Sequence, residues 1–162
     1  MDEIVLRAQA KWPAVPDVYG WLFLDRRGRW LLRNPTRETH EPIGNSALRQ
    51  FIARNYCCDA HGRWFFQNGP QRVFVRLAYT PFVLRTRGET FLDQCGLAFE
   101  SGGALLDEEG SLLLHGNGRI ALLDDRDLAG YAEAHSEAIE RLPRIESSEV
   151  SRRFGFIPDP TP

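Results

Sequence analysis

The sequence lacks the features that would place a protein in a membrane or stabilise it with disulfides. Its 162 residues contain no run of about 18 apolar side chains, so we expect no membrane-spanning helix. The first residues are acidic and no long apolar stretch follows them, which argues against a secretory signal. Of the three cysteines, Cys57 and Cys58 would point to opposite faces of a strand, which leaves Cys95 as the odd one. We therefore expect reduced thiols and a cytoplasmic protein.

Lysine is almost absent: of the 20 Lys and Arg residues, only Lys11 is a lysine. The net charge is −2, but residues 1–90 carry 14 Lys or Arg and 8 Asp or Glu, whereas residues 91–162 carry 6 and 14. Arginine enrichment favours bidentate recognition of anions, or it reflects genome composition and solvated surfaces. The charge asymmetry predicts that the two halves attract each other, within one chain or between two copies.

One short phrase occurs three times: Asp-x-x-Gly-x followed by three large apolar residues. An aspartate that opens a four-residue turn can accept a backbone hydrogen bond, and the glycine tolerates the left-handed conformation that such a turn requires. Each copy therefore predicts a hairpin corner between two buried strands, and each glycine is expected to have a positive φ. The corners are Asp25 to Gly28, Asp59 to Gly62 and Asp107 to Gly110.

The pattern of strands predicts an α+β protein that is mainly antiparallel β. Eight to ten strands are expected, in partly duplicated hairpin or meander units that form a sandwich or a sheet covered by two short helices. Residues 1–17 are expected to be irregular because of Pro13 and Pro16. One helix is predicted from the N-cap Asn45 to Asn55, and a second from Asp124 or Asp125 to Leu142.

The same pattern predicts a single domain over residues 1–162. Two related sub-units, at about 15–87 and 95–142, would share one core. The C-terminal segment 143–162 is rich in proline and is expected to be irregular, with its aromatic side chains docked on the body.

Arginine and tryptophan supply the candidate binding surface. Arg29 and Arg63 occupy the same position in two copies of the phrase, directly before Trp30 and Trp64. If the two hairpins are neighbours, the pairs could line one surface as an anion platform or in cation–π contacts. In the alternative interpretation, the tryptophans fill the core and the arginines cover its edge. Arg72 and Arg76, which share one strand face, would extend the patch.

Other chemistry finds little support in the sequence. The glycines of Asn68-Gly69-Pro70 and Gly116-Asn117-Gly118 are followed by neither a Lys-Ser/Thr pair nor a helix, so they predict turns and no phosphate loop. The cluster from Cys57 to His61 has alternating side-chain directions that separate its thiols, so we expect no metal site. We also expect no cofactor, and nucleic acid is an improbable partner because no recognised motif is present.

The stretch Gly62-Arg-Trp-Phe-Phe-Gln-Asn-Gly-Pro-Gln-Arg-Val-Phe-Val75 resembles the signature region of an uncharacterised bacterial protein family, over about residues 15–140. The resemblance implies a bacterial cytoplasmic protein and carries no activity, cofactor or partner.

Because every recurring motif serves folding, the sequence favours a non-enzymatic binding or assembly module with an Arg/Trp surface for a small anionic ligand. Its partner would be a second copy, in a homodimer, or another protein. The alternative is a small hydrolase or transferase with an Arg-lined active site for an anionic substrate.

Overall fold

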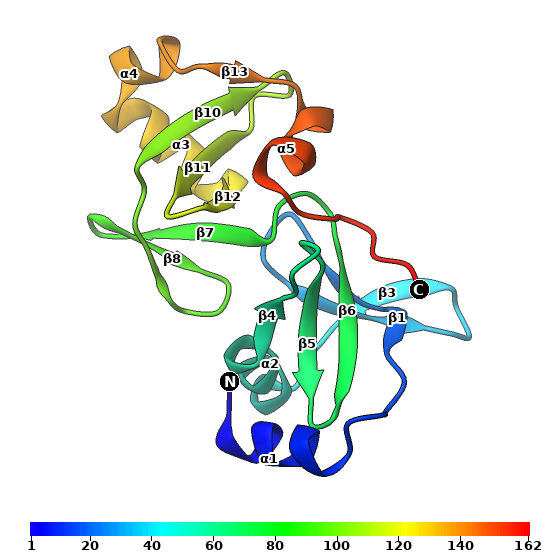
Figure 1. Ribbon diagram of the computed structural model, residues 1–162. Coiled ribbons are helices and arrows are strands. Elements are labelled where there is room, and N and C mark those ends of the chain that lie inside the picture. The colour runs from blue at the N-terminus through cyan, green and yellow to red at the C-terminus, as the bar shows by residue number, and fades with distance from the viewer. The chain divides into compact units, whose positions relative to one another are not determined.

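The computed structural model describes residues 1–162, which form two compact units. Unit 1 comprises residues 1–25, 29–78 and 156–162, and unit 2 comprises residues 26–28 and 79–155. Apart from residues 26–28 and 156–162, the chain passes from unit 1 to unit 2 between residues 78 and 79. The last residues, 156–162, belong to unit 1, so the chain leaves that unit after residue 78 and returns to it at its C-terminal end (Figure 1).

Unit 1 contains a six-stranded sheet in the order β3-β2-β1-β6-β5-β4. Two antiparallel meanders, β1 to β3 and β4 to β6, are joined where β1 runs parallel to β6. The strands are β1 (Val18–Leu24), β2 (Trp30–Asn34), β3 (Thr39–Pro42), β4 (Tyr56–Cys58), β5 (Trp64–Asn68) and β6 (Gln71–Leu77).

Unit 2 has the same strand order with one strand added at an edge: β13-β10-β11-β12-β7-β8-β9. Two antiparallel meanders are again joined by a parallel pair, β7 with β12. The strands are β7 (Phe82–Arg87), β8 (Thr90–Asp93), β9 (Ala98–Phe99), β10 (Gly103–Asp107), β11 (Leu112–Gly116), β12 (Arg119–Leu123) and β13 (Arg144–Ile145). The predicted α+β class with mainly antiparallel strands is confirmed.

Five helices accompany the sheets, where two were expected. They are α1 (Glu3–Lys11), α2 (Ser46–Arg54), α3 (Asp125–Ala134), α4 (Ser136–Glu140) and α5 (Ser147–Phe154). The helix predicted after Asn45 is confirmed, and the Asn45 side chain accepts a hydrogen bond from the Leu48 N–H at 3.0 Å. The expected helix at 124–142 is interrupted at His135, which ends α3 and precedes α4.

The expectation of irregular structure was wrong for two terminal segments. Helix α1 ends at Lys11, so Pro13 lies outside it and breaks no helical hydrogen bond. Helix α5 ends at Gly155, which adopts a left-handed cap with φ of 67°. Each helix buries a single residue, Val5 or Val150, so its sequence shows little of the apolar stripe that identifies longer helices.

All three predicted corners are hairpin turns with glycine in the left-handed region. The φ angles of Gly28, Gly62 and Gly110 are 71°, 76° and 80°. In the second corner, Asp59 Oδ1 accepts hydrogen bonds from the backbone N–H groups of His61 and Arg63, both at 2.9 Å. The carboxylate therefore organises the turn through the backbone, as the phrase predicts.

A fourth corner, between β8 and β9, has the same chemistry and was not predicted. Asp93 Oδ1 accepts from the N–H groups of Cys95 at 2.9 Å and Leu97 at 3.0 Å, and Gly96 has φ of 80°. Its sequence, Asp93-Gln-Cys-Gly96, fits Asp-x-x-Gly. Leu97 takes the variable position after the glycine, and the next three residues are Ala98, Phe99 and Glu100, so the three large apolar residues that marked the other copies are missing.

In every corner, the second carboxylate oxygen accepts a hydrogen bond from a side chain. Arginine is the donor to Asp25, Asp59 and Asp93, and tyrosine is the donor to Asp107. The pairs are Asp25–Arg29 at 2.6 Å, Asp59–Arg63 at 2.8 Å, Asp93–Arg119 at 2.8 Å and Asp107–Tyr79 at 2.8 Å. Burial of the Tyr79 hydroxyl and its bond to the Asp107 carboxylate raise the pKa of Tyr79.

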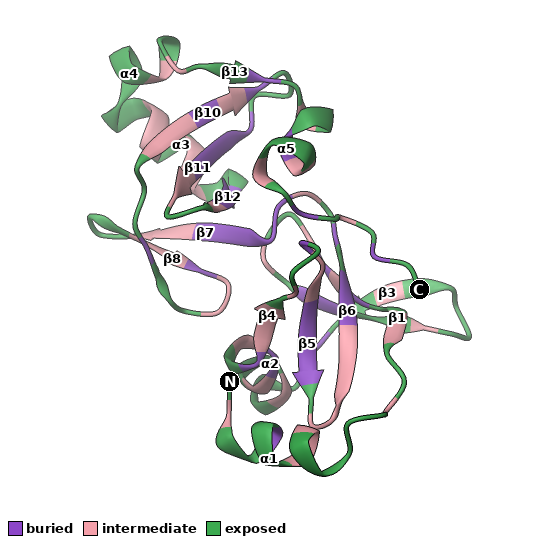
Figure 2. Ribbon diagram, viewed as in Figure 1, coloured by how far each residue is buried: buried purple, intermediate pink, exposed green.

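The apolar side chains of the strands form the core of each unit, while the helices are largely exposed (Figure 2). In unit 1, Leu22, Phe74 and Val75 are almost completely buried. In unit 2, Leu84 and Leu113 are fully buried on the central strands β7 and β11. Successive apolar residues within these strands are buried, which means that both faces of each sheet are covered.

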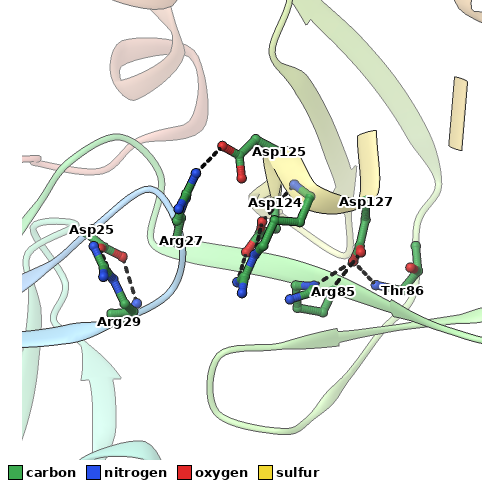
Figure 3. Close-up of polar contacts among 9 residues, drawn as sticks. Asp25, Arg27, Arg29, Arg85, Thr86, Asp124, Asp125 and Asp127 are labelled. Atoms are coloured by element: carbon green, nitrogen blue, oxygen red, sulfur yellow. Dashed lines mark hydrogen bonds and ion pairs between the residues drawn. The ribbon is translucent and has the colours of Figure 1, made fainter. Parts of the chain in front are cut away.

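The junction between β12 and α3 is built from a cluster of aspartates and arginines (Figure 3). Asp124, whose side chain is fully buried, accepts from the Arg126 backbone N–H at 3.0 Å and from its guanidinium Nε at 2.8 Å. Asp127 accepts from the guanidinium of Arg85 at 2.7 Å and 3.0 Å and from the Thr86 backbone N–H at 2.7 Å. These bonds attach the start of the helix to the end of the parallel strand pair.

Burial by itself would raise the pKa of Asp124, but the hydrogen bonds from the side chain and backbone of Arg126 outweigh it and lower the pKa to about 2. The pKa of Asp127 is also lowered, chiefly by its hydrogen bond from Arg85. Both carboxylates therefore stay ionised until the solution is strongly acidic.

The corner geometry predicts opposite effects for one substitution at two glycines. Gly62→Ala should lower the free energy of unfolding by about 1 kcal/mol or more, because a Cβ is strained in the left-handed region. Gly130→Ala, in the interior of α3 where a Cβ would meet no atom within 4 Å, should raise it by about 0.5–1 kcal/mol. Urea unfolding of both variants measures the change in the free energy of unfolding. Equal changes would contradict the left-handed conformation of Gly62.

The depressed pKa of Asp124 predicts a loss of stability in acid. An aspartate has a pKa of about 3.9 in the unfolded chain, so the contribution of Asp124 is complete above about pH 4 and is lost as the pH falls towards 2. Asp124→Asn should destabilise the protein at neutral pH and flatten the decline between pH 4 and 2. Chemical unfolding at each pH tests this, with Glu133→Gln, an exposed carboxylate on α3, as the control. An unchanged slope in Asp124→Asn would contradict the prediction.

Candidate functional site

The two tryptophans of the predicted surface lie with the core side chains of unit 1. Trp30 is only 2% exposed and its indole Nε1 is buried without a hydrogen-bond partner. Trp64 is half-buried. The Tyr56 ring contacts both, with centroid distances of 5.0 Å to Trp30 and 4.8 Å to Trp64. The two corners therefore bring their tryptophans to one aromatic cluster, and Trp30 is unavailable for a surface contact.

The arginines that precede these tryptophans are bonded to their own corners. Arg29 is exposed and its Nε donates to Asp25, while Arg63 is half-buried and donates to Asp59 in the same way. The Arg63–Asp59 bond raises the pKa of Arg63. No hydrogen bond, ion pair or ring contact joins Arg29 to Arg63. Each guanidinium thus neutralises a carboxylate.

Three of the predicted residues nevertheless gather on one face of unit 1. The guanidinium of Arg63 lies 4.7 Å from the centre of the Phe74 ring, and that of Arg72 lies 5.0 Å from the Phe65 ring. Phe65 and Phe74 are partners across β5 and β6 and their rings are 5.7 Å apart. Arg76 follows on the same side of β6. We call Arg63, Phe65, Arg72, Phe74 and Arg76 the Arg/Phe face. Phe65 and Phe74 are themselves buried, so the arginines, whose guanidinium groups make cation–π contacts with the two rings, form the outer surface of this face.

The C-terminal tail, residues 156–162, contacts two members of this face, Arg63 and Arg76. Its backbone joins the β4–β5 corner to β6: the Ile157 N–H donates to the Gly62 carbonyl at 2.9 Å, and the Pro158 carbonyl accepts from the Leu77 N–H at 2.8 Å. Ile157 also forms a parallel bridge with Arg63.

Side chains add to the contacts of the tail. Phe156 is 6% exposed and Pro160 is buried. Asp159 pairs with Arg76 at 3.5 Å, although both side chains are largely exposed. The expectation that the aromatic end of the chain docks on the body is confirmed for Phe156.

A depression of about 460 Å³ in unit 1 brings Arg72 together with Asp17. Its other lining residues include Pro13, Pro16 and Pro70. Asp17, Pro13 and Pro16 are exposed, so the depression is shallow. Arg63, Arg29 and Arg76 do not line it.

A larger groove, of about 540 Å³, lies in unit 2 between α3 and the β7–β8 hairpin. Aromatic and charged side chains line it, among them Glu89, Phe91, Arg126, Tyr131 and His135. The sequence interpretation assigned no role to this group. The only available signal was the spacing of Tyr131 and His135, four residues apart on one helix face.

The remaining candidates do not form a reactive centre. Burial raises the pKa of the Cys57 and Cys58 thiols, which disfavours the nucleophilic thiolate. No group of three or more His, Cys, Asp or Glu side chains is placed to hold a metal ion. None of the helices is long and apolar enough to span a bilayer.

Two solved structures resemble this chain. One is a DUF1285 family protein from Silicibacter pomeroyi DSS-3, with a TM-score of 0.51 and 19% identity over 82% of this chain and 84% of that chain. The other is a DUF1285 family protein from Shewanella baltica OS155, with a TM-score of 0.43 and 13% identity over 69% and 90%. At 19% identity, the likeness to the first concerns the fold alone.

No curated protein matches the chain significantly. A family model covers nearly all of it, which confirms the resemblance to an uncharacterised family without assigning an activity. The chain belongs to the family described as "Protein of unknown function (DUF2946)", whose model matches residues 1–161.

Proposed function

We propose that this protein is a non-enzymatic binding module whose Arg/Phe face recognises an extended, proline-containing segment. The observation that supports the proposal is the tail itself, which contacts that face and is held by two backbone hydrogen bonds, one ion pair and two buried side chains. Extended segments rich in proline have little conformational freedom to lose on binding, which makes them suitable ligands.

The contacts divide the recognition between backbone and side chains. The hydrogen bonds to Gly62 and Leu77 require an extended backbone but no particular residue. Burial of Phe156 provides about 2 kcal/mol and demands a large apolar side chain. The exposed Arg76–Asp159 pair contributes little energy but favours an acidic residue three positions later. The preferred ligand is therefore an aromatic residue followed by an acidic, proline-rich stretch.

The alternative function, a small hydrolase or transferase with an Arg-lined site for an anionic substrate, has less support. Such a site needs arginines free to bind an anion beside a general base. Arg29 and Arg63 donate to Asp25 and Asp59. The depression that holds Arg72 and Asp17 is shallow, and three of its eight lining residues are prolines.

The same recognition between two copies would produce a homodimer. Residues 156–162 of one copy would occupy the Arg/Phe face of the other, and reciprocal exchange would give a symmetric pair at little energetic cost, because the contacts are the same in both states. The homodimer predicted from the charge asymmetry would then be held by the tails, and its ion pairs would add salt dependence.

A substitution that weakens binding of the C-terminal tail should make the Arg/Phe face accessible to an added peptide. We expect Phe156→Ala in the full chain to bind a fluorescent peptide of sequence FGFIPDPTP more tightly than the wild type does, by about tenfold or more, because the competing tail is held less firmly. Fluorescence anisotropy measures the affinity. Arg76→Glu combined with Phe156→Ala should reduce this binding.

Thr161→Ala, an exposed tail position, is the control and should bind the peptide as the wild type does. A peptide with alanine in place of both phenylalanines should bind neither protein. If the native peptide fails to bind Phe156→Ala while circular dichroism shows a folded protein, recognition by this face is refuted.

Tail exchange predicts a dimer whose fraction rises with protein concentration. Phe156→Ala should lower that fraction, because it removes the buried side chain that holds the tail in either state. Light scattering across a range of protein concentrations tests this at low and high salt. A monomer mass at all concentrations would exclude exchange between copies while leaving the peptide result unaffected.

A further inference from the structure

The groove of unit 2 has an aromatic wall formed by three rings. The Phe91 and Tyr131 ring centres are 6.0 Å apart, and the Tyr131 and His135 rings stack at 4.2 Å with an angle of 18° between their planes. Phe91 comes from β8 and Tyr131 from α3, and His135 is the residue that caps the C-terminal end of α3. The volume of about 540 Å³ is within the range of small-molecule sites.

Helix α3 leaves free space in the groove at Gly130, which has no side chain. Gly130 lines the groove, and a Cβ added there would meet no atom within 4 Å. Helix α3 has no buried residue, so its groove-facing side chains are not enclosed by the protein. A ligand that entered the groove would therefore cover aromatic surface that is partly solvated in this structure.

Two of the three strongly charged residues in the groove are already neutralised. Arg126 donates to both oxygens of Asp124, and both oxygens of Asp127 accept from Arg85. Glu89, at the tip of the β7–β8 hairpin, is exposed and has no ion-pair partner. The groove thus presents one unpaired carboxylate beside three aromatic rings.

We propose that this groove is a binding site for a small organic cation, of the alkylated ammonium class. Aromatic faces attract such cations through the ring quadrupole, and a nearby carboxylate adds Coulombic attraction. In this arrangement, Tyr131 and Phe91 contact the alkyl groups and Glu89 pairs with the charge. An anionic ligand is disfavoured, because the guanidinium of Arg126 is held by Asp124.

Choline tests the proposal, with 3,3-dimethyl-1-butanol as its uncharged isostere. In an NMR titration of the full chain, choline should cause saturable shifts at α3 and the β7–β8 hairpin with a Kd in the millimolar range, and the isostere should bind about tenfold more weakly. Equal binding of the two compounds, preferential binding of benzoate, or no saturable shift would each overturn the proposal.

Variants locate the site. Glu89→Gln should weaken choline binding by about three- to fivefold, and Tyr131→Ala by about tenfold or more. Glu133→Gln, an exposed carboxylate on α3 outside the groove, is the matched control and should leave the Kd unchanged. If Tyr131→Ala does not fold, Glu89→Gln at the exposed hairpin tip decides the matter. Unchanged affinity in Glu89→Gln would refute the role of the carboxylate. The result is independent of peptide binding by unit 1.

Discussion

The hydrogen bonding of four corner aspartates is the interaction on which the two sheets depend. One oxygen of each carboxylate accepts backbone N–H groups of its own turn, and the other accepts from an arginine or tyrosine side chain. The first contact sets the geometry of the hairpin. The second removes the penalty of leaving a charge or acceptor unpaired, which is large at the nearly buried Asp93 and Asp107.

The same chemistry limits where function can lie. Arginines that the sequence offers as anion ligands, above all Arg29 and Arg63, are used to neutralise corner carboxylates. Charged residues outside the turns have other roles: Arg76 on the surface of β6 pairs with Asp159 of the tail, and Glu89 on the β7–β8 hairpin is exposed. The two proposed sites use these residues, together with aromatic side chains that the strands and α3 place beside them.

The two sheets have the same strand order, apart from the added β13, because their strands are connected in the same way. In each unit, two antiparallel meanders meet through one parallel pair, β1 with β6 or β7 with β12. Hairpins are local and are visible in a sequence, because a turn motif and two apolar runs are sufficient. A parallel pair joins residues that are distant in the chain, such as Val18 with Val73, and no local pattern specifies it.

The sequence by itself determined the class of the fold, the three marked corners with their left-handed glycines, and the helix capped by Asn45, because each is encoded within a few neighbouring residues. It also grouped Arg63, Arg72 and Arg76 in one candidate binding surface, which stays a prediction. Only the tertiary structure decided that their aromatic partners are Phe65 and Phe74, that Trp30 is buried, and that the tail reaches Gly62 and Leu77. These contacts join segments far apart in the chain, so their energies depend on packing that no local pattern records.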